Sequence, residues 1–255
     1  MRQYASPRYL LSGSQFVTEH IIALPYWCEK EVDNFLQLLD RWPDFCRASA
    51  PYRFLLVKRF DTEPSSRLFS ACERHAPTTE LDCSKYPWKG WPGGANGMFK
   101  NAMEHVAETY TNTAGFLFWF EHDVIPIQPD WLDWLSRSWQ ERFSIMGHFV
   151  TQEWINMHHV QSHYKPYFSG SACYSKHLVH SPAFTGIAEK GCFDVHLTFE
   201  CVKARNVTNK MWHLFDLYFF MPPWSKSCDL NKLMLNGAKE FRQREVLIQY
   251  ILENR

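Results

Sequence analysis

The chain has 255 residues, which is long enough for one domain with a substantial hydrophobic core. Hydrophobic residues make up 45% of it and charged residues 21%, and these fractions exclude a disordered or collagen-like chain. Basic and acidic residues are balanced at 27 each, so the formal net charge is zero. Broad binding to nucleic-acid phosphates needs a basic surplus and is therefore not expected.

Signals for a membrane or an oxidising compartment are not visible in the sequence. The residues Met1–Pro7 lack the apolar run of a signal peptide, and no later apolar stretch approaches the length of a membrane span. The eight cysteines are widely spaced and form no CxxC pair, a pattern typical of reduced thiols. We therefore expect a cytoplasmic protein without a transmembrane segment.

Strands and helices are predicted to alternate along the first 150 residues. Strands are expected at residues 18–27, 52–60, 115–120 and 143–150, and helices at residues 29–42, 65–75, 95–109 and 129–142. The stretch 78–94 is rich in proline and glycine and is expected to be an irregular loop. The run 115–120 is apolar without alternation, which is typical of a central strand covered on both faces.

The pattern weakens after residue 151. There we expect a strand near 167–174, a helix over 193–204 and a last helix over 238–253. Strands that alternate with helices predict an α/β fold with a mixed, mostly parallel central sheet and helices on both faces.

Two acidic residues follow the most apolar predicted strand directly. Glu121 and Asp123 stand where that strand ends, and ligands of open α/β sheets gather at the carboxyl ends of the strands. Two carboxylates beside apolar surface are costly unless something compensates their charge. A divalent cation would do so, and hard oxygen ligands suit Mg²⁺ or Mn²⁺. The alternative is that Asp123 only caps a turn.

The surroundings of this acidic triplet have a recognisable order. A helix opens at Gly93–Met98, the apolar strand leads into Glu121-His122-Asp123, and a further helix opens at Pro129–Leu132. This order resembles the core of GT-A fold glycosyltransferases, which have a Rossmann-like α/β fold. The resemblance covers residues 19–150 in element order and is specific over 93–132.

The resemblance implies one glycosyltransferase domain over residues 1–255. Residues 19–150 would form the nucleotide-sugar-binding half, 151–228 the acceptor-binding half and 229–255 a C-terminal helical extension. The implied activity is metal-dependent hexosyl or pentosyl transfer from a nucleotide-sugar donor to a hydroxyl of a glycan acceptor.

The resemblance also implies a metal site that holds Mn²⁺ or Mg²⁺. Asp123 would bind the metal that bridges the donor diphosphate, and Glu121 would lie near the ribose or a metal-bound water. His213 matches the C-terminal histidine that some GT-A enzymes add to the metal, although a core or surface histidine is the more common interpretation. One departure is that the triplet begins with glutamate rather than aspartate, which reaches further.

The nucleotide-sugar site would draw on several segments. Asn96 matches the asparagine that packs under the nucleotide, but Ala95 stands where the family has arginine, so that contact must come from elsewhere. A glycine in the strand near 167–174 permits close approach of backbone to a sugar, or marks a simple bend. The nucleotide-sugar-binding residues implied in this way are Pro25, Tyr26, Asp61, Asn96, Glu121, His122 and Gly170.

Sugar transfer to a hydroxyl also needs a base that removes the hydroxyl proton. Asp194 begins a predicted helix and resembles the family's late acidic motif, so it is the candidate base of an inverting reaction. The alternative is an acid that caps the helix N-terminus. Glu200 is the second candidate for the base.

Two other functions stay open at this point. His158, His159 and His163 would hold zinc in a hydrolase if their segment were helical. No acid or cysteine beside them completes a known zinc pattern, so an exposed polar face is the simpler explanation. The 11 tryptophans, Trp88, Trp91 and Trp154 among them, would suit a non-catalytic carbohydrate-binding module or a bulky core.

Overall fold

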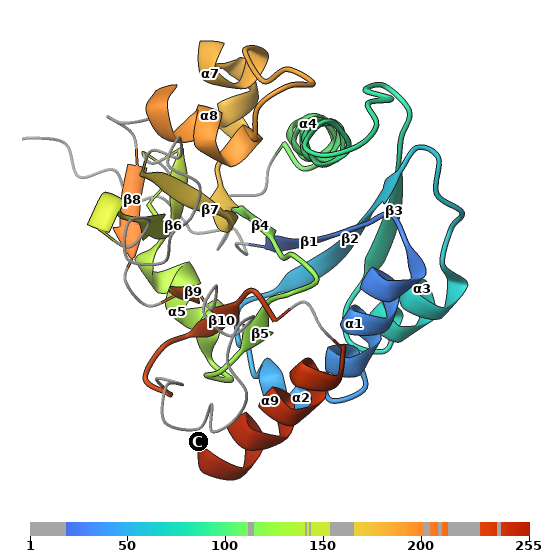
Figure 1. Cartoon of the computed structure of the whole chain (residues 1–255), viewed down its shortest axis with the longest axis vertical. Helices are drawn as coiled ribbons and strands as arrows, with labels where there is room; N and C mark the ends of the chain where they lie inside the picture. The colour runs from blue at the N-terminus through green and yellow to red at the C-terminus, as the bar shows by residue number, and fades with distance from the viewer. Residues whose placement is uncertain are drawn as a thin grey trace, which may run out of the picture.

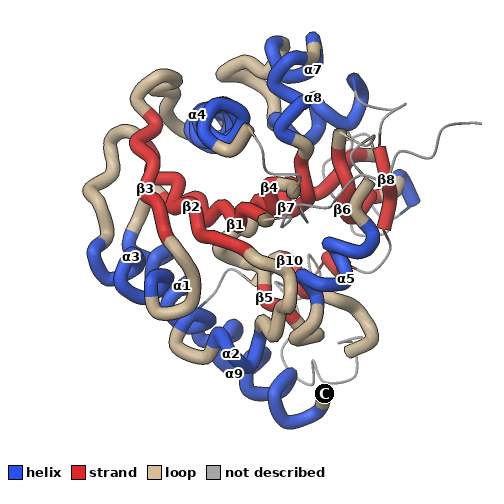
Figure 2. Tube along the Cα trace, turned by 180° about the vertical axis from the view of Figure 1, so that it is seen from behind, coloured by secondary structure: helices blue, strands red, loops and turns tan. Residues whose placement is uncertain are grey.

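The computed structural model describes residues 19–111, 115–140, 142, 144–153, 166–200, 205–208, 211–213, 230–238 and 241–255. The described residues form three layers, with helices on both faces of a twisted central sheet (Figures 1 and 2). The α/β architecture predicted from the alternating elements is thereby confirmed.

The central sheet has seven strands in the order β3-β2-β1-β4-β7-β6-β8. Strands β3, β2, β1 and β4 run parallel, β7 is antiparallel to both β4 and β6, and β8 is parallel to β6. Their bounds are β1 His20–Tyr26, β2 Tyr52–Arg59, β3 Thr78–Cys83, β4 Leu117–Trp119, β6 Ile145–Val150, β7 Tyr167–Tyr174 and β8 Arg205–Thr208.

The central strands are apolar on both faces because each face is covered by helices. In β1, Ile22 and Leu24 belong to one hydrophobic cluster, whereas Ile21 and Ala23 belong to the other. Neighbouring positions of a strand point to opposite faces, so a strand between two helical layers needs apolar residues at every position.

Helices cover the two faces unequally. The cluster on one face includes residues of α1 Glu29–Leu39, α2 Trp42–Phe45, α3 Ser66–Glu73, α5 Trp131–Ser138 and α9 Phe241–Asn254. The cluster on the other face includes residues of α4 Gly93–Thr109, the 3-10 turn η1 Lys176–His180, α7 Pro182–Thr185 and α8 Phe193–Glu200. Figure 1 shows α4, α7 and α8 above the sheet and the α1, α2 and α9 group below it.

Three expectations need correction. The loop expected over 78–94 begins with the edge strand β3, whose polar, partly exposed residues hide it from a hydrophobicity pattern. The first helix ends at Leu39, and Pro43 lies in the first turn of the short helix α2 rather than ending α1, since proline fits a first helical turn. The helix expected to reach 142 ends at Ser138. The helix expected over 193–204 is described over Phe193–Glu200, and residues 201–204 lie outside the described residues.

A small second sheet joins distant parts of the chain. Strand β10, Met234–Asn236, pairs antiparallel with β5, Ile125–Pro126, and parallel with β9, Met211–His213. Helix α9 packs against α1. The C-terminal segment, expected to be a helical extension, thus shares the hydrophobic core of the first half of the chain.

Within the described residues, we find no helix with both the length and the apolar character that crossing a membrane requires.

Candidate functional site

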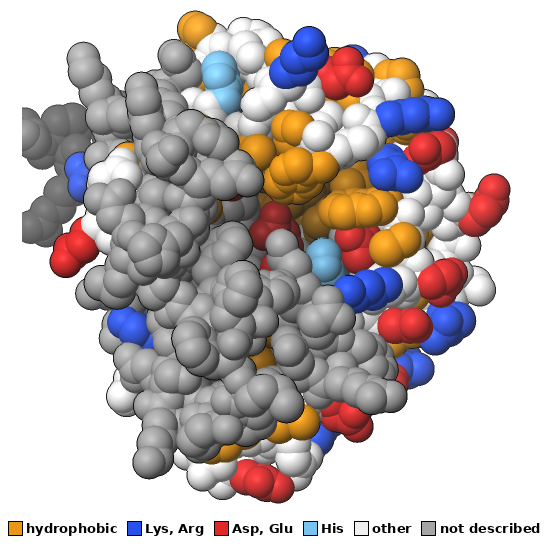
Figure 3. Space-filling view, viewed as in Figure 1, with side chains coloured by type: hydrophobic (Ala, Val, Ile, Leu, Met, Phe, Trp, Pro, Cys, Tyr) orange, Lys and Arg blue, Asp and Glu red, His pale blue; other side chains and the backbone are white. Residues whose placement is uncertain are grey.

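A cavity of about 630 Å³ lies at the carboxyl ends of β1 and β4. Figure 3 shows a hollow on this face of the molecule with acidic and histidine side chains inside it and hydrophobic side chains along its border. Of the residues implied by the family resemblance, the cavity is lined by Pro25, Glu121, His122, Asp123, Gly170 and Asp194.

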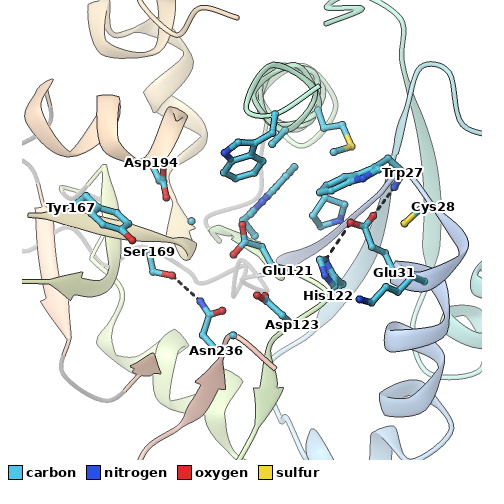
Figure 4. Close-up of a pocket in the computed structure, with 18 residues that line it drawn as sticks. Trp27, Cys28, Glu31, Glu121, His122, Asp123, Tyr167, Ser169, Asp194 and Asn236 are labelled. Atoms are coloured by element: carbon cyan, nitrogen blue, oxygen red, sulfur yellow. Dashed lines mark hydrogen bonds and ion pairs between the residues drawn. The ribbon is translucent and has the colours of Figure 1, made fainter. Parts of the chain in front are cut away.

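Glu121 and Asp123 both face this cavity, at the end of β4 (Figure 4). The chain turns there because the Val124 N–H donates to the Glu121 carbonyl oxygen at 3.0 Å. The Asp123 carbonyl oxygen accepts from the Ala238 N–H at 3.0 Å, which ties the turn to the segment after β10. The turn therefore holds two buried or half-buried carboxylates at the edge of the sheet where ligands bind.

Strand β7 positions the Glu121 carboxylate. The Ser171 hydroxyl donates to Glu121 Oε2 at 2.9 Å. At Gly170, a side-chain Cβ would lie 2.8 Å from Glu121 Oε1, so only glycine leaves this space open. The glycine expected to admit a sugar thus also makes room for an acidic side chain.

A buried arginine lies behind the acidic turn. Arg244 in α9 is 0% exposed, and its Nη2 donates to the Val124 carbonyl oxygen at 2.9 Å. Its Nε donates to the Asn34 carbonyl oxygen in α1 at 3.2 Å. Burial lowers the pKa of Arg244 to about 9, and the negative charge of Asp123 opposes this shift. The guanidinium links α1, α9 and the turn, and it supplies positive charge behind Asp123.

A glutamate that the sequence analysis missed forms another wall of the cavity. The buried Glu31 accepts from the Trp27 N–H at 2.8 Å through Oε2, and its Oε1 lies 3.5 Å from His122 Nδ1. Burial raises the pKa of Glu31 to about 7. Glu31 lies in the first turn of α1, where an acid is expected for its interaction with the helix dipole, so its sequence position gives no separate signal.

The candidate base lies on the side of the cavity away from Glu31, beside Tyr167 and Ser169 (Figure 4). Asp194 is in the first turn of α8, and its Oδ1 accepts from the Val195 N–H at 2.8 Å. Loss of solvent around the carboxylate raises the pKa of Asp194 to about 6.

Asn96 has a structural place rather than a position in the cavity lining. Its Nδ2 donates to the carbonyl oxygens of Ala188 and Gly191, each at 2.7 Å, and its Oδ1 accepts from the Phe193 N–H at 3.0 Å. It therefore holds the segment that leads to Asp194 against the first turn of α4.

Two further residues of the implied nucleotide site also lie outside the lining. The Tyr26 ring is buried, and its hydroxyl donates to Glu80 Oε1 and accepts from the Ser65 N–H. Asp61 forms an ion pair with Arg59. Their contacts fix the loops around β1 and β2.

The C-terminal strand β10 supplies the remaining wall. Asn236 Nδ2 donates to Ser169 Oγ at 2.8 Å, and Gly237 follows with a φ of 102° that favours glycine. The backbone of His213 in β9 is in register with Asn236. Asn236 was missed because a short strand near the C-terminus gives no chemical signal of its own.

Several sequence candidates lie outside the described residues. These are His158, His159, His163 and Trp154, together with the side chains of His213 and Glu200. Among the side chains that the structure does describe, no three His, Cys, Asp or Glu residues cluster in a way that would hold a metal ion. The described residues therefore offer the Glu121 and Asp123 carboxylates to a metal ion, but they do not supply a complete set of protein ligands.

The chain has a GT-A glycosyltransferase fold, as the order of its elements and its acidic triplet predicted. It is similar to the galactosyltransferase LgtC, solved in complex with donor and acceptor sugar analogues, with a TM-score of 0.52 and 8% identity over 89% of this chain and 95% of LgtC. The bifunctional glycosyltransferase WbbM gives a TM-score of 0.58 and 9% identity over 94% of this chain and 50% of WbbM. Mouse xyloside xylosyltransferase 1 gives 0.53 and 8% identity over 86% of this chain and 98% of that enzyme.

Neither a protein-family model nor a curated protein sequence matches the chain. At identities near these values, the likeness to the solved structures shows the fold, and the chemistry has to be argued from the cavity.

Proposed function

We propose that the protein is a metal-dependent glycosyltransferase that moves a sugar from a nucleotide-sugar donor to a hydroxyl of a glycan acceptor, with inversion. One observation carries the proposal: a single cavity of a GT-A fold gathers Glu121, Asp123 and Asp194 from two distant segments. The donor and acceptor sugar analogues bound by LgtC support a cavity of this fold as a place for both substrates.

The charge of the cavity supports a metal ion. The lining contains four carboxylic acids, Glu31, Glu121, Asp123 and Asp194, and two basic residues, Lys30 and His122. A nucleoside diphosphate is itself anionic, so a cation is needed for it to bind beside so many carboxylates.

The donor atoms present fit Mn²⁺ or Mg²⁺. Glu121 and Asp123 would hold the ion through carboxylate oxygens, and His213 is a candidate third ligand. Such ions commonly take one or two protein carboxylates and complete their shell with water and substrate phosphates. When bound, the ion neutralises the charge that develops on the leaving diphosphate.

In this proposal, Asp194 acts as the base. As the acceptor oxygen bonds to the anomeric carbon, the bond from that carbon to the diphosphate oxygen breaks, and the hydroxyl proton passes to the Asp194 carboxylate. A pKa of about 6 makes Asp194 a better proton acceptor than an ordinary aspartate while leaving it mostly ionised at neutral pH.

Asp194→Asn is expected to lower the transfer rate by about 100- to 10,000-fold while raising stability at pH 7.5. Because the folded-state pKa of about 6 lies above the ordinary 3.8, ionising Asp194 costs folding free energy as the pH rises through 6. The gain in melting temperature should vanish near pH 3, where the carboxyl is largely protonated in both the folded and the unfolded chain. Thermal unfolding from about pH 3 to pH 8 measures this, with Asp40→Asn on the surface as a control. A loss of stability at pH 7.5 with normal transfer contradicts the assignment.

The proposed function is tested by thermal unfolding with a set of nucleoside diphosphates and nucleotide sugars, with and without Mn²⁺. A ligand that binds only the folded state raises the melting temperature. We expect one nucleoside diphosphate and its nucleotide sugar to raise the melting temperature strongly, and only when Mn²⁺ is present. When a glycan is added to that nucleotide sugar, the nucleoside diphosphate should be released. A non-catalytic carbohydrate-binding module would ignore every nucleotide. The three similar structures named above are glycosyltransferases, which gives no support to a zinc hydrolase.

A further inference from the structure

One tryptophan at the cavity is exposed to an unusual degree. Trp91 lines the cavity and is 72% exposed, and Val246, at 57%, is the other large hydrophobic residue in the described part of the chain that is exposed. The Trp91 indole forms no hydrogen bond or ring contact with the residues that the structure describes. An exposed indole beside a cavity marks a surface that gains stability when a ligand covers it.

Side-chain contacts fix the loop that carries Trp91 against α4. Tyr86 and Trp88 pack together with ring centroids 5.4 Å apart, and the Tyr86 hydroxyl donates to Glu104 Oε1 at 2.7 Å. Lys100 Nζ lies 4.8 Å from the centre of the Tyr86 ring. These contacts hold the loop on α4, so Trp88 is used for structure whereas Trp91 remains at the cavity.

The loop that carries Trp91 lies beside the segment that carries the candidate base, Asp194. A Cβ on Gly93 would lie 2.9 Å from Glu189 Cγ, and Asn96 hydrogen-bonds to Ala188 and Gly191. The start of α4 thus packs directly on the residues that lead to Asp194. An acceptor hydroxyl within reach of Asp194 places its own sugar ring, or the next one, on this side of the cavity.

We propose that Trp91 is a stacking platform for a pyranose ring of the glycan acceptor. This inference rests on the proposed function. The C–H face of a pyranose is apolar and flat enough to cover an indole, and its hydroxyl groups then point toward the carboxylates of the cavity. The nucleobase is expected on the other side, where Pro25, Trp27 and Glu31 meet at the end of β1.

The test measures binding of simple sugars separately from binding of nucleotides. The sugar probes are methyl β-glucoside, methyl β-galactoside, methyl α-mannoside and lactose, observed by saturation-transfer NMR. The nucleotide probes are UDP and GDP with Mn²⁺, observed by thermal unfolding. The proteins are the full-length wild type, Trp91→Ala, Trp91→Phe and Val246→Ala, the last as a control that removes an exposed apolar side chain in α9.

We expect Trp91→Ala to weaken binding of the responsive sugar by about 5- to 10-fold, the size of one lost aromatic contact, and Trp91→Phe to restore most of it. Val246→Ala should bind sugar normally, and the nucleotide response should be unchanged in all variants. A weakened nucleotide response with normal sugar binding overturns the proposal and assigns Trp91 to the nucleobase. Absence of saturation transfer from every sugar to the wild type also overturns it. Sugar binding that depends on Trp91 in a protein that ignores every nucleotide keeps the platform and overturns the transferase.

Discussion

Asp123→Asn is expected to weaken Mn²⁺-dependent nucleotide binding by more than about 100-fold, because losing a residue that only supports a metal ligand already costs about 10- to 100-fold. The amide keeps the shape of the side chain but removes the charge that a cation needs. The hydrogen bond from the Ala238 N–H to the Asp123 carbonyl oxygen does not involve the side chain, so the turn should persist. Titration calorimetry with the nucleotide that responds in the screen, with and without Mn²⁺, measures the change.

Asp40→Asn is the matched control for this substitution. It makes the same change of charge, but the Asp40 carboxylate lies on the surface and pairs with Arg74 Nη2 at 2.9 Å. We expect its nucleotide affinity to stay within about twofold of the wild type, since exposed ion pairs contribute little. If Asp123→Asn behaves like this control, the protein does not hold a metal at the acidic turn.

Gly170→Ala tests the other acid without changing any charge. The added methyl group would lie 2.8 Å from Glu121 Oε1, so the Glu121 carboxylate, which Ser171 holds through Oε2, must shift. A displaced ligand is expected to weaken Mn²⁺-dependent nucleotide binding by about 10-fold, which is less than the loss of Asp123. Wild-type affinity in this variant means that the place of Glu121 does not matter for the donor.

The sequence predicted the parts of the fold that follow from local pattern. The apolar run before Glu121 could be read as a central strand because both of its faces are covered, and the acids that follow it then had to stand at the ligand-binding edge. Strand β3 could not be read in this way. It is an edge strand with polar, partly exposed residues, so its pattern resembles that of a loop.

The missed site residues share a different cause. Glu31, Ser169 and Asn236 come from α1, β7 and β10, and only the folded chain brings them to one cavity. Each has an ordinary local explanation: an acid in a first helical turn, a serine in a strand and an asparagine before a glycine. Tyr26 and Asn96 match the family's order, but their side chains lie outside the cavity lining. A position in the sequence gives no information about which way its side chain points.

The arginine behind the acidic turn gives the largest expected effect on stability. Arg244→Met is expected to lower the free energy of unfolding by about 3 to 5 kcal/mol, because it removes two buried hydrogen bonds with a charged donor, each of which contributes about 1.5 to 3 kcal/mol. Methionine fills much of the volume but leaves the carbonyl oxygens of Val124 and Asn34 without their donor. It also leaves Asp123 without the nearby positive charge. Urea unfolding followed by circular dichroism measures the loss.

Arg74→Met controls for the loss of an arginine as such. Arg74 pairs with Asp40 at 2.9 Å on the surface, where the expected change is below about 1 kcal/mol. Arg244→Lys separates charge from geometry, because lysine keeps the positive charge but its ammonium group cannot reproduce the planar fork of donors. We expect it to unfold at a urea concentration between those of Arg244→Met and the wild type. If Arg244→Met is as stable as Arg74→Met, neither the two carbonyl oxygens nor Asp123 depends on the guanidinium, and α9 stabilises the acidic turn through apolar packing alone.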